Sequence, residues 1–548
     1  MAWMGLLVLG ACSDPPPANS PPLPDALLAK DVSAVDVAPV KEVHWALDAT
    51  TPAVVGLPAV PSCTTPWTFA LPPLPPPEGN IGMETGSAMS AVGLDEKLFL
   101  YVILPGKSTL DTAADGPLQL TADPGVQVVS VANAQHGIGS AVVRFKTEGQ
   151  HAITAAFGDG RSGTAGFYAY TTPLPVWQIS IADEVWKAMK ANPYLKEEHP
   201  CTLAMGATVY GDATIRLHGG SSVDLPKKSF QIKLKNGAKL PDGRTNLILR
   251  SEFIDKTLAR TWLGYQAFST ATWLPVPKSE FVHARVNQSF YGVMHVVEHI
   301  DSHYLQLRGR DKDGVLYEGD PSLQLANPGA NFTPMFPPTN YPLVYQKHGG
   351  TKSYADLIEF IEVVLQAPDA TLFSQLELYL KVRDWMEYAA MMTVLQNREH
   401  IRKNWYAYRS PTSPDDRFEL LAWDLDITWG HLWSEKFDVL DEAINSDLPP
   451  DTGNVKVDPK FYNQLYRILD NPAWRKVWAQ RVLALADVVL DDKFVQPRLN
   501  YLQCLLAADV VADGRKRGTT AEYVSRLAEI AQFAKDRRAF LHKSLGTP

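Results

Sequence analysis

Between residues 81 and 173, short apolar stretches alternate with turns that contain glycine or aspartate. Stretches of this length and composition predict β-strands, and their regular spacing is typical of a small β-sandwich of immunoglobulin-like type. The predicted strands cover residues 98–104, 126–131, 140–145, 151–157 and 166–171. This region contains no group of residues that suggests catalysis, so a spacer or adhesion module is expected.

From residue 174 to residue 548, strand patterns come first and helical patterns dominate later. Strands are predicted at 208–217, 227–235, 246–250, 280–286 and 291–297, and helices at 179–191, 255–271, 300–307, 354–366, 372–380 and 383–395. The last part, from about residue 460, is mainly helical. Strands followed by helices indicate an α+β domain with a strand-rich first lobe and a helical second lobe.

An aromatic strand at 405–408 and a second strand at 418–423 predict a β-hairpin that ends in Asp424-Leu-Asp426. Two carboxylates at positions i and i+2 of an extended strand point the same way. Such a pair is unfavourable unless a cation or a shared proton offsets the repulsion, and Mg²⁺ prefers oxygen ligands of this kind. The hairpin end is therefore a candidate metal site, and a solvated acidic turn is the alternative.

The composition indicates a globular protein of more than one domain. The chain has 548 residues, which predicts two or three domains, and its 45% apolar and 20% charged residues are typical of a globular protein. Acidic residues outnumber basic ones by 60 to 51, for a net charge of −9. This balance argues against a nucleic-acid partner.

The N-terminus resembles a bacterial lipoprotein signal over residues 1–12. A short apolar segment ends in Leu9-Gly-Ala-Cys12, and Cys12 would carry the lipid, although no Lys or Arg precedes the segment. Residues 13–80 are rich in proline and read as a linker. A lipid-anchored protein of the cell envelope, or a secreted one, is expected. An exported chain can pair two of Cys63, Cys201 and Cys504, and the sequence leaves the pairing open.

Three polar clusters outside the hairpin carry candidate chemistry. Gly219-Gly220 followed by Lys228 suits a phosphate-covering turn, although the P-loop spacing is absent and an ordinary turn is the alternative. Glu298 ends a predicted strand beside a cleft, and Asp301 or Ser302 is expected to cap the next helix.

The third cluster precedes the aromatic strand. Glu399 and His400 are acid or base candidates, and Asn404 is a candidate oxygen ligand for a metal. Simple polarity at a helix end is the alternative for Glu399 and His400.

Taken in order, these motifs resemble the CotH protein-kinase family over about residues 175–545. Each motif is weak alone, but five in order are fairly specific. They are Ile215-Arg-Leu-His-Gly-Gly-Ser-Ser222 with Pro226-Lys-Lys-Ser-Phe230, Asp255-Lys-Thr-Leu-Ala-Arg260, Val286-Asn-Gln-Ser-Phe-Tyr-Gly-Val-Met-His-Val-Val-Glu-His-Ile-Asp301, Lys403-Asn-Trp-Tyr-Ala-Tyr408 and Ala422-Trp-Asp-Leu-Asp-Ile-Thr-Trp-Gly430.

The resemblance implies a divergent, two-lobed protein-kinase-like fold that transfers the ATP γ-phosphoryl group to Ser or Thr of a protein. It implies that Asp424 holds Mg²⁺ or Mn²⁺ with Asp426 and Asn404 beside it. The nucleotide side is assigned to Gly219, Gly220, Lys228 and Glu298. Glu399 stands where the family usually has an aspartate, which moves the carboxylate outward by a methylene, and displacements of about 1 Å can cost about a hundredfold in rate.

Two alternative functions follow. The first is a catalytically inactive kinase-like surface scaffold or binding protein, which the export signal and Glu399 both favour. The second is a carbohydrate-binding or -processing surface protein, suggested by the predicted sandwich, the 14 tryptophans and the paired carboxylates. The protein substrate and the oligomeric state are left open by the sequence.

Overall fold

The computed structural model describes residues 78–79, 82–85, 91–104, 106, 110–319, 330–350, 353–397, 399–400, 403–431 and 464–546. The predicted signal with Cys12, and the linker up to residue 77, lie outside the described residues. No helix within these ranges is both long enough and apolar enough to span a membrane. Helices and strands are both abundant, which confirms the α+β prediction.

Two antiparallel sheets form the region before residue 171. One has the order β1-β9-β8-β5 with β3 parallel to β9, and the other has the order β2-β4-β7-β6. Their shared core joins Leu100 and Val143 of one sheet to Ile153 and Phe167 of the other. The strands are β1 (Glu78–Gly79), β2 (Gly82–Thr85), β3 (Ala91–Gly93), β4 (Leu98–Ile103), β5 (Leu118–Ala122), β6 (Val126–Gln135), β7 (Ile138–Phe145), β8 (Gly149–Phe157) and β9 (Ser162–Tyr170). We call this region the sandwich.

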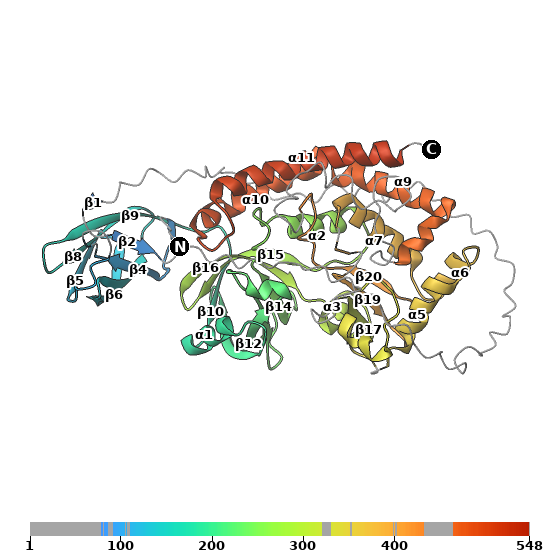
Figure 1. The fold of residues 1–548 in the computed structure, drawn as a ribbon, viewed down its shortest axis with the longest axis horizontal. Coiled ribbons are helices and arrows are strands. Elements are labelled where there is room, and N and C mark those ends of the chain that lie inside the picture. The colour runs from blue at the N-terminus through green and yellow to red at the C-terminus, as the bar shows by residue number, and fades with distance from the viewer. Residues whose placement is uncertain are drawn as a thin grey trace, which may run out of the picture. The chain divides into compact units, whose positions relative to one another are not determined.

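Seven strands then close into a barrel in the order β10-β11-β12-β13-β14-β16-β15 (Figure 1). The parallel pairing of β10 with β15 completes the ring, and the inward side chains form a separate apolar core. The strands are β10 (Val176–Ser180), β11 (His199–Met205), β12 (Thr208–His218), β13 (Ser229–Leu234), β14 (Asn246–Arg250), β15 (Ser279–Val286) and β16 (Ser289–Glu298). Helix α1 (Asp183–Ala191) is inserted after β10, and helix α2 (Arg260–Ala271) follows β14.

A second sheet, in the order β18-β17-β19-β20, belongs to the helical part of the chain. Its strands are β17 (Val315–Gly319), β18 (Tyr345–His348), β19 (Trp405–Arg409) and β20 (Glu419–Ala422). The predicted hairpin is confirmed: β19 and β20 are antiparallel, and the structure places Trp405 opposite Ala422. Around it lie α3 (Ser302–Leu307), α4 (Tyr341–Val344), α5 (Ala355–Gln366), α6 (Leu372–Leu376) and α7 (Val382–Leu395).

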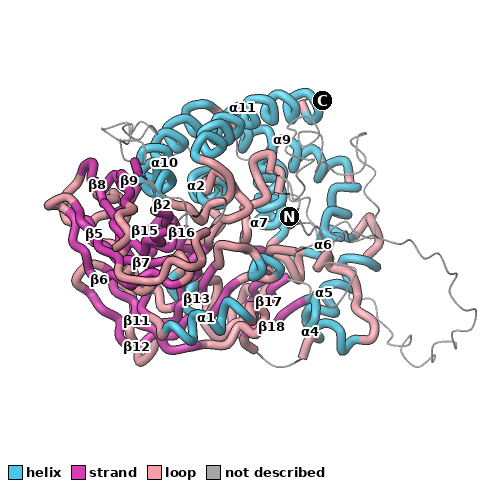
Figure 2. Tube along the Cα trace, turned by 60° about the vertical axis from the view of Figure 1, so that its left-hand side comes forward, coloured by secondary structure: helices cyan, strands magenta, loops and turns pink. Residues whose placement is uncertain are grey.

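Three long helices end the chain: α9 (Pro472–Val489), α10 (Asp492–Ala512) and α11 (Thr520–Leu545). They lie side by side in both views (Figures 1 and 2), and α9 contacts both α7 and α11. Thr519 and Glu522 form a capping box that satisfies backbone N–H groups at the start of α11. Short 3₁₀ segments occupy Ser221–Asp224, Pro338–Asn340 and Gln464–Asp470.

Two of the predicted helices begin four or more residues later than expected. The helix expected at 179–191 begins only at Asp183, because the residues before it form β10, whose partners β11 and β15 are distant in the sequence. The helix expected from residue 255 begins at Arg260. The Asp255 carboxylate accepts the N–H groups of Thr257 and Arg260 and so holds a turn in place of the first helical residues.

Candidate functional site

Glu399, Asp424 and Asp426 converge in the helical lobe. One carboxylate oxygen from each lies within 4.8 Å of the others, which makes a group that could hold a metal ion. We call these three residues the acid cluster. Glu399 lies in the turn between α7 and β19, and the two aspartates follow the end of β20. The sequence had grouped Asp424 with Asp426, and the fold adds Glu399 to them.

The backbone at the hairpin end is a turn and not an extended strand. Asp424 has a left-handed conformation with φ of 55°, and β20 already ends at Ala422. The assumption that both carboxylates project from one strand is therefore wrong, although they do converge. The backbone N–H of Trp429 donates to the Leu395 carbonyl at the end of α7, and this bond ties the residues after the turn to that helix. A non-glycine residue held at positive φ is costly, and such residues gather at functional sites.

Glu399 is held by two neighbours. Lys403 Nζ lies 2.9 Å from its Oε1, and Asn404 Nδ2 donates to its Oε2 over 2.5 Å. Asn404, predicted as a metal ligand, thus positions Glu399 through its amide nitrogen. The turn itself is fixed because Asn397 Oδ1 accepts the N–H groups of Glu399 and His400.

His400 is a structural residue in this arrangement. Its ring contacts the Asn397 carbonyl through Nδ1 and the Tyr466 hydroxyl through Nε2, at 2.8 Å for the latter. Burial lowers the pKa of His400 to about 4, so the ring is neutral at pH 7. Both nitrogens are engaged, which leaves His400 no role as the acid or base considered from the sequence.

Arg250 at the end of β14 is the residue that the sequence analysis missed. Its guanidinium lies 2.6 Å from Asp424 Oδ1, 2.9 Å from Asp426 Oδ2 and 3.0 Å from Glu252 Oε1. Arg250 belongs to the barrel, whereas the acid cluster belongs to the helical lobe. Only the fold brings these residues together, because 174 positions separate Arg250 from Asp424.

The charges of this site do not balance. If all are ionised, four carboxylates, the acid cluster and Glu252, face two cations, Arg250 and Lys403, which leaves a formal charge of −2. Burial, followed by the neighbouring Asp424, raises the pKa of Asp426 well above its usual range. Asp424 Oδ1 is paired with Arg250 Nη1, 2.6 Å away. Three converging carboxylates, an all-oxygen set whose mutual repulsion a cation would offset, fit a hard divalent cation.

The Gly219–Gly220 turn lies on the barrel between β12 and β13. Gly219 has φ of 116°, and a Cβ there would meet Ser222 Oγ at 2.0 Å, so the position requires glycine. Lys228 donates from Nζ to the Val223 carbonyl over 2.6 Å and holds this turn closed. Burial lowers the pKa of Lys228. The fold gives Lys228 a structural contact, and its predicted phosphate role remains a prediction.

Glu298, assigned to the nucleotide pocket, is a buried and satisfied carboxylate. Arg308 Nη2 lies 2.6 Å from its Oε2, and the Lys278 N–H donates to the same oxygen over 3.0 Å. Asp301 caps α3 by accepting the N–H groups of His303 and Tyr304, as predicted. These contacts account for both acidic residues without a ligand.

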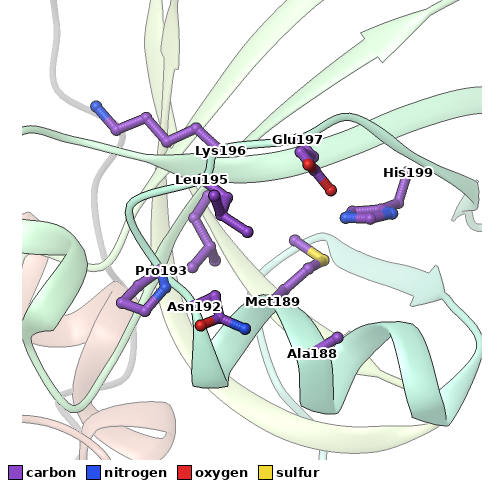
Figure 3. Close-up of a pocket in the computed structure, with 9 residues that line it drawn as sticks. Ala188, Met189, Asn192, Pro193, Leu195, Lys196, Glu197 and His199 are labelled. Atoms are coloured by element: carbon purple, nitrogen blue, oxygen red, sulfur yellow. The ribbon is translucent and has the colours of Figure 1, made fainter.

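A small cavity lies elsewhere on the barrel, between α1 and the segment that leads into β11 (Figure 3). Met189 and Asn192 line it from the α1 side, and Glu197 and His199 line it from the other. Its volume is about 60 Å³. Ligand pockets usually measure several hundred Å³, so this cavity is too small for a nucleotide.

An α+β domain with three converging carboxylates beside an arginine from a second lobe defines a candidate metal-dependent enzyme. The chain belongs to the CotH kinase protein family, whose model matches residues 215–541 and so includes every residue of the site. It is similar to the inner spore coat protein H of Bacillus subtilis (strain 168), with 24% identity over 381 residues. That alignment covers 68% of this chain and 98% of the relative.

Similarity to solved structures is low. The HipA–HipB–operator DNA complex of Shewanella oneidensis MR-1 aligns with a TM-score of 0.26 and 12% identity, over 70% of this chain and 76% of that one. Domains 4–9 of the surface layer protein SbsC align with a TM-score of 0.15 and 10% identity, over 41% of this chain and 27% of that one. TM-scores of this size do not establish a shared fold.

Proposed function

We propose that this chain is a CotH-like atypical protein kinase that transfers the γ-phosphoryl group of ATP to a Ser or Thr hydroxyl of a protein. The observation that carries the proposal is the acid cluster, which lies inside the region matched by the family model. Its excess of negative charge is suited to Mg²⁺ or Mn²⁺. Two lobes that contribute opposite charges to one site are consistent with a divergent protein-kinase-like fold.

The chemistry needs positioning and charge neutralisation more than covalent help, because the transition state of phosphoryl transfer is loose. Asp424 and Asp426 would hold the metal, which neutralises phosphate oxygens when bound. Glu399 faces the same space, and Lys403 and Asn404 fix its carboxylate in place to orient the acceptor hydroxyl. We assign the binding of phosphate to Arg250 and no longer to Lys228, because the Arg250 guanidinium lies within 3 Å of the metal ligands Asp424 and Asp426.

We also propose a cellular location and a domain organisation for this chain. We assign a lipid anchor to Cys12 and a place in the cell envelope or outside the cell to the mature protein. The similarity to a protein named as an inner spore coat protein supports a surface location. We assign the kinase-like domain to residues 174–548 and an immunoglobulin-like fold to the sandwich.

An inactive kinase-like scaffold is the second candidate. Glu399 in place of the usual aspartate favours it, as do the ion pairs by which Arg250 occupies Asp424 and Asp426. A scaffold would keep the fold and the location at the cell surface but would not transfer phosphate.

Transfer of label from γ-labelled ATP separates the two candidates. The full chain is incubated with Mg²⁺ or Mn²⁺, and incorporation is measured both into the chain itself and into casein as a general acceptor. Wild type should incorporate label. The rate for Asp424→Asn should be at least about a hundredfold lower, because the substitution removes a metal-binding charge. Asp415→Asn is the matched control, since Asp415 lies in the exposed loop of the same hairpin.

Equal incorporation by wild type and Asp424→Asn would contradict the assignment of the site. Metal-dependent ATP binding without any incorporation, into the chain or into casein, would favour the scaffold.

A further inference from the structure

Arg250 is oriented by its own lobe before it reaches the acid cluster. Glu252 accepts from Arg250 Nε over 3.0 Å, which leaves the two terminal nitrogens free to point toward the other lobe. Glu252 is fixed in turn by His295 Nδ1 at 3.0 Å and by the Thr261 hydroxyl at 3.2 Å. It has a left-handed φ of 45° and is almost completely buried. Strained backbone beside a site indicates a conformation kept for function.

The two terminal nitrogens of Arg250 take one oxygen from each aspartate. Nη1 pairs with Asp424 Oδ1 and Nη2 with Asp426 Oδ2. The side chain of Arg250 is only 13% exposed, so these contacts are weakly screened by water. A metal ion bound by Asp424 and Asp426 would compete for the same oxygens and would lie close to a permanent positive charge.

We propose that Arg250 is a built-in counter-cation that occupies the acid cluster in the absence of nucleotide and makes divalent-metal binding depend on nucleotide phosphates. Phosphate oxygens are bidentate acceptors for a guanidinium, so an arriving nucleotide draws Arg250 away from the aspartates and supplies further ligands to the metal. The inference rests on the proposed function, because it assumes that metal and nucleotide share this site.

Coupling of this kind is reciprocal. If nucleotide raises the affinity for metal by some factor, metal raises the affinity for nucleotide by the same factor, and such factors usually lie between about 5 and 150. Without the arginine, metal should bind alone, and nucleotide should add little to its affinity. The expected signature is thus a tighter metal site in a variant that has lost a positive charge.

The test is the Mn²⁺ affinity of the full chain, measured by electron paramagnetic resonance with and without ATP. Arg250→Gln should bind Mn²⁺ alone at least about tenfold more tightly than wild type, and the enhancement by ATP seen in wild type should be lost. Arg250→Lys keeps the charge without the bidentate geometry and should fall between the two. Arg538→Gln, at an exposed ion pair on α11, is the control and should match wild type.

A second variant guards against misfolding, because Arg250→Gln leaves Glu252 without its cation. Glu252→Gln keeps Arg250 but loosens its orientation, and it should also raise the affinity for Mn²⁺ alone. Equal or weaker binding of Mn²⁺ alone by folded Arg250→Gln and Glu252→Gln would overturn the role of Arg250. Absence of Mn²⁺ binding by every protein, with ATP present, would instead overturn the metal site and the proposed function.

Discussion

At the scale of single residues, the candidate site is built from positions whose backbone is unusual. Asp424, Asn404 and Glu252 all have positive φ, at 55°, 64° and 45°. For residues other than glycine this conformation costs roughly 1–2 kcal/mol and persists only where neighbouring contacts enforce it. At this site those contacts are the ion pairs of Arg250 and the hydrogen bond from the Asn404 amide, which bring the carboxylates together.

Asn404 allows the value of positioning to be measured. Asn404→Gly keeps a residue that tolerates positive φ and removes only the amide that holds Glu399. We expect the rate of label transfer from γ-labelled ATP to fall about a hundredfold, the usual effect of displacing a positioning group by about 1 Å, while the affinity for Mn²⁺ with ATP stays close to that of wild type. Asn404→Ala adds backbone strain and should also lower the melting temperature. An unchanged rate of transfer by folded Asn404→Gly would show that Glu399 needs no positioning by the amide.

Residue identity could be predicted where chemistry is written into local sequence. Asp424 and Asp426 stand out because two carboxylates follow an apolar strand, and Glu399 stands out through its motif. Arg250 carries no such signal, since an arginine at a strand end is ordinary until the fold places it against the aspartates. Lys228 was predicted to bind phosphate because a lysine near a Gly-Gly turn suits an anion-binding turn, a pattern that is visible in the local sequence.

At the scale of elements, the turn before β13 and the corner between α10 and α11 are joined by a buried ion pair. Lys227 Nζ lies 2.7 Å from Asp513 Oδ2 and donates to the Val293 carbonyl over 2.6 Å. The N–H of Val293 donates to the same Asp513 oxygen. Lys227 and Asp513 are both almost completely buried, so the barrel and the C-terminal helices meet at a fully desolvated contact.

Two adjacent lysines give a matched pair of variants. Lys227→Met leaves the Asp513 charge buried without a partner and should lower the free energy of unfolding by about 3–5 kcal/mol. Lys228→Met removes one bond to a carbonyl at the rim of a turn and should cost roughly 1 kcal/mol. Chemical denaturation of both full-length variants measures the difference. Equal losses would show that the Lys227 contact does not hold the barrel to the helices.

Elements with strong local patterns were predictable, and elements fixed by distant partners were not. The strand predicted at 246–250 is β14, and the helix predicted at 383–395 is α7 to within a residue. β10 was missed because a single short stretch becomes a strand only through its pairing with β11 and β15. The helix predicted at 300–307 is α3, which begins at Ser302 after its cap, Asp301.

At the scale of the whole molecule, the sandwich makes specific contacts with the barrel. The Lys97 N–H donates to the Gln288 carbonyl over 3.0 Å, and Arg285 Nη2 donates to the Leu94 carbonyl over 2.8 Å. Buried His283 of β15 pairs with Glu96 of the sandwich through Nε2 and with Asp509 of α10 through Nδ1. The spacer expected from the sequence is therefore in contact with the domain that follows it.

His283 makes the stability of this contact depend on pH. Burial alone would lower its pKa, but the bonds to Asp509 and Glu96 raise the pKa to about 9, against about 6.5 when unfolded. Arg285 lies near Glu96, and the Tyr170 hydroxyl donates to Asp509. The folded state binds the proton more tightly, so the stabilisation, about 3 kcal/mol, is complete below pH 6.5 and is lost as the pH rises through about 9.

The prediction is checked by unfolding wild type and His283→Gln at several pH values between 6 and 10. The difference in free energy of unfolding between the two proteins should shrink by about 3 kcal/mol over this range, because only wild type carries the titrating ring. A difference that stays constant with pH would contradict a protonated His283 between the two carboxylates.

The central claim is that the acid cluster binds a metal–nucleotide complex, and thermal stability of the full chain tests it most directly. Wild type and Asp424→Asn are melted with Mg²⁺ or Mn²⁺, with and without ATP. A ligand at a hundred times its dissociation constant stabilises by about 2.7 kcal/mol, a shift that is readily measured. The account predicts a shift in wild type that requires both metal and ATP and is absent from folded Asp424→Asn. A shift of equal size in the two proteins, or none in wild type, would contradict it.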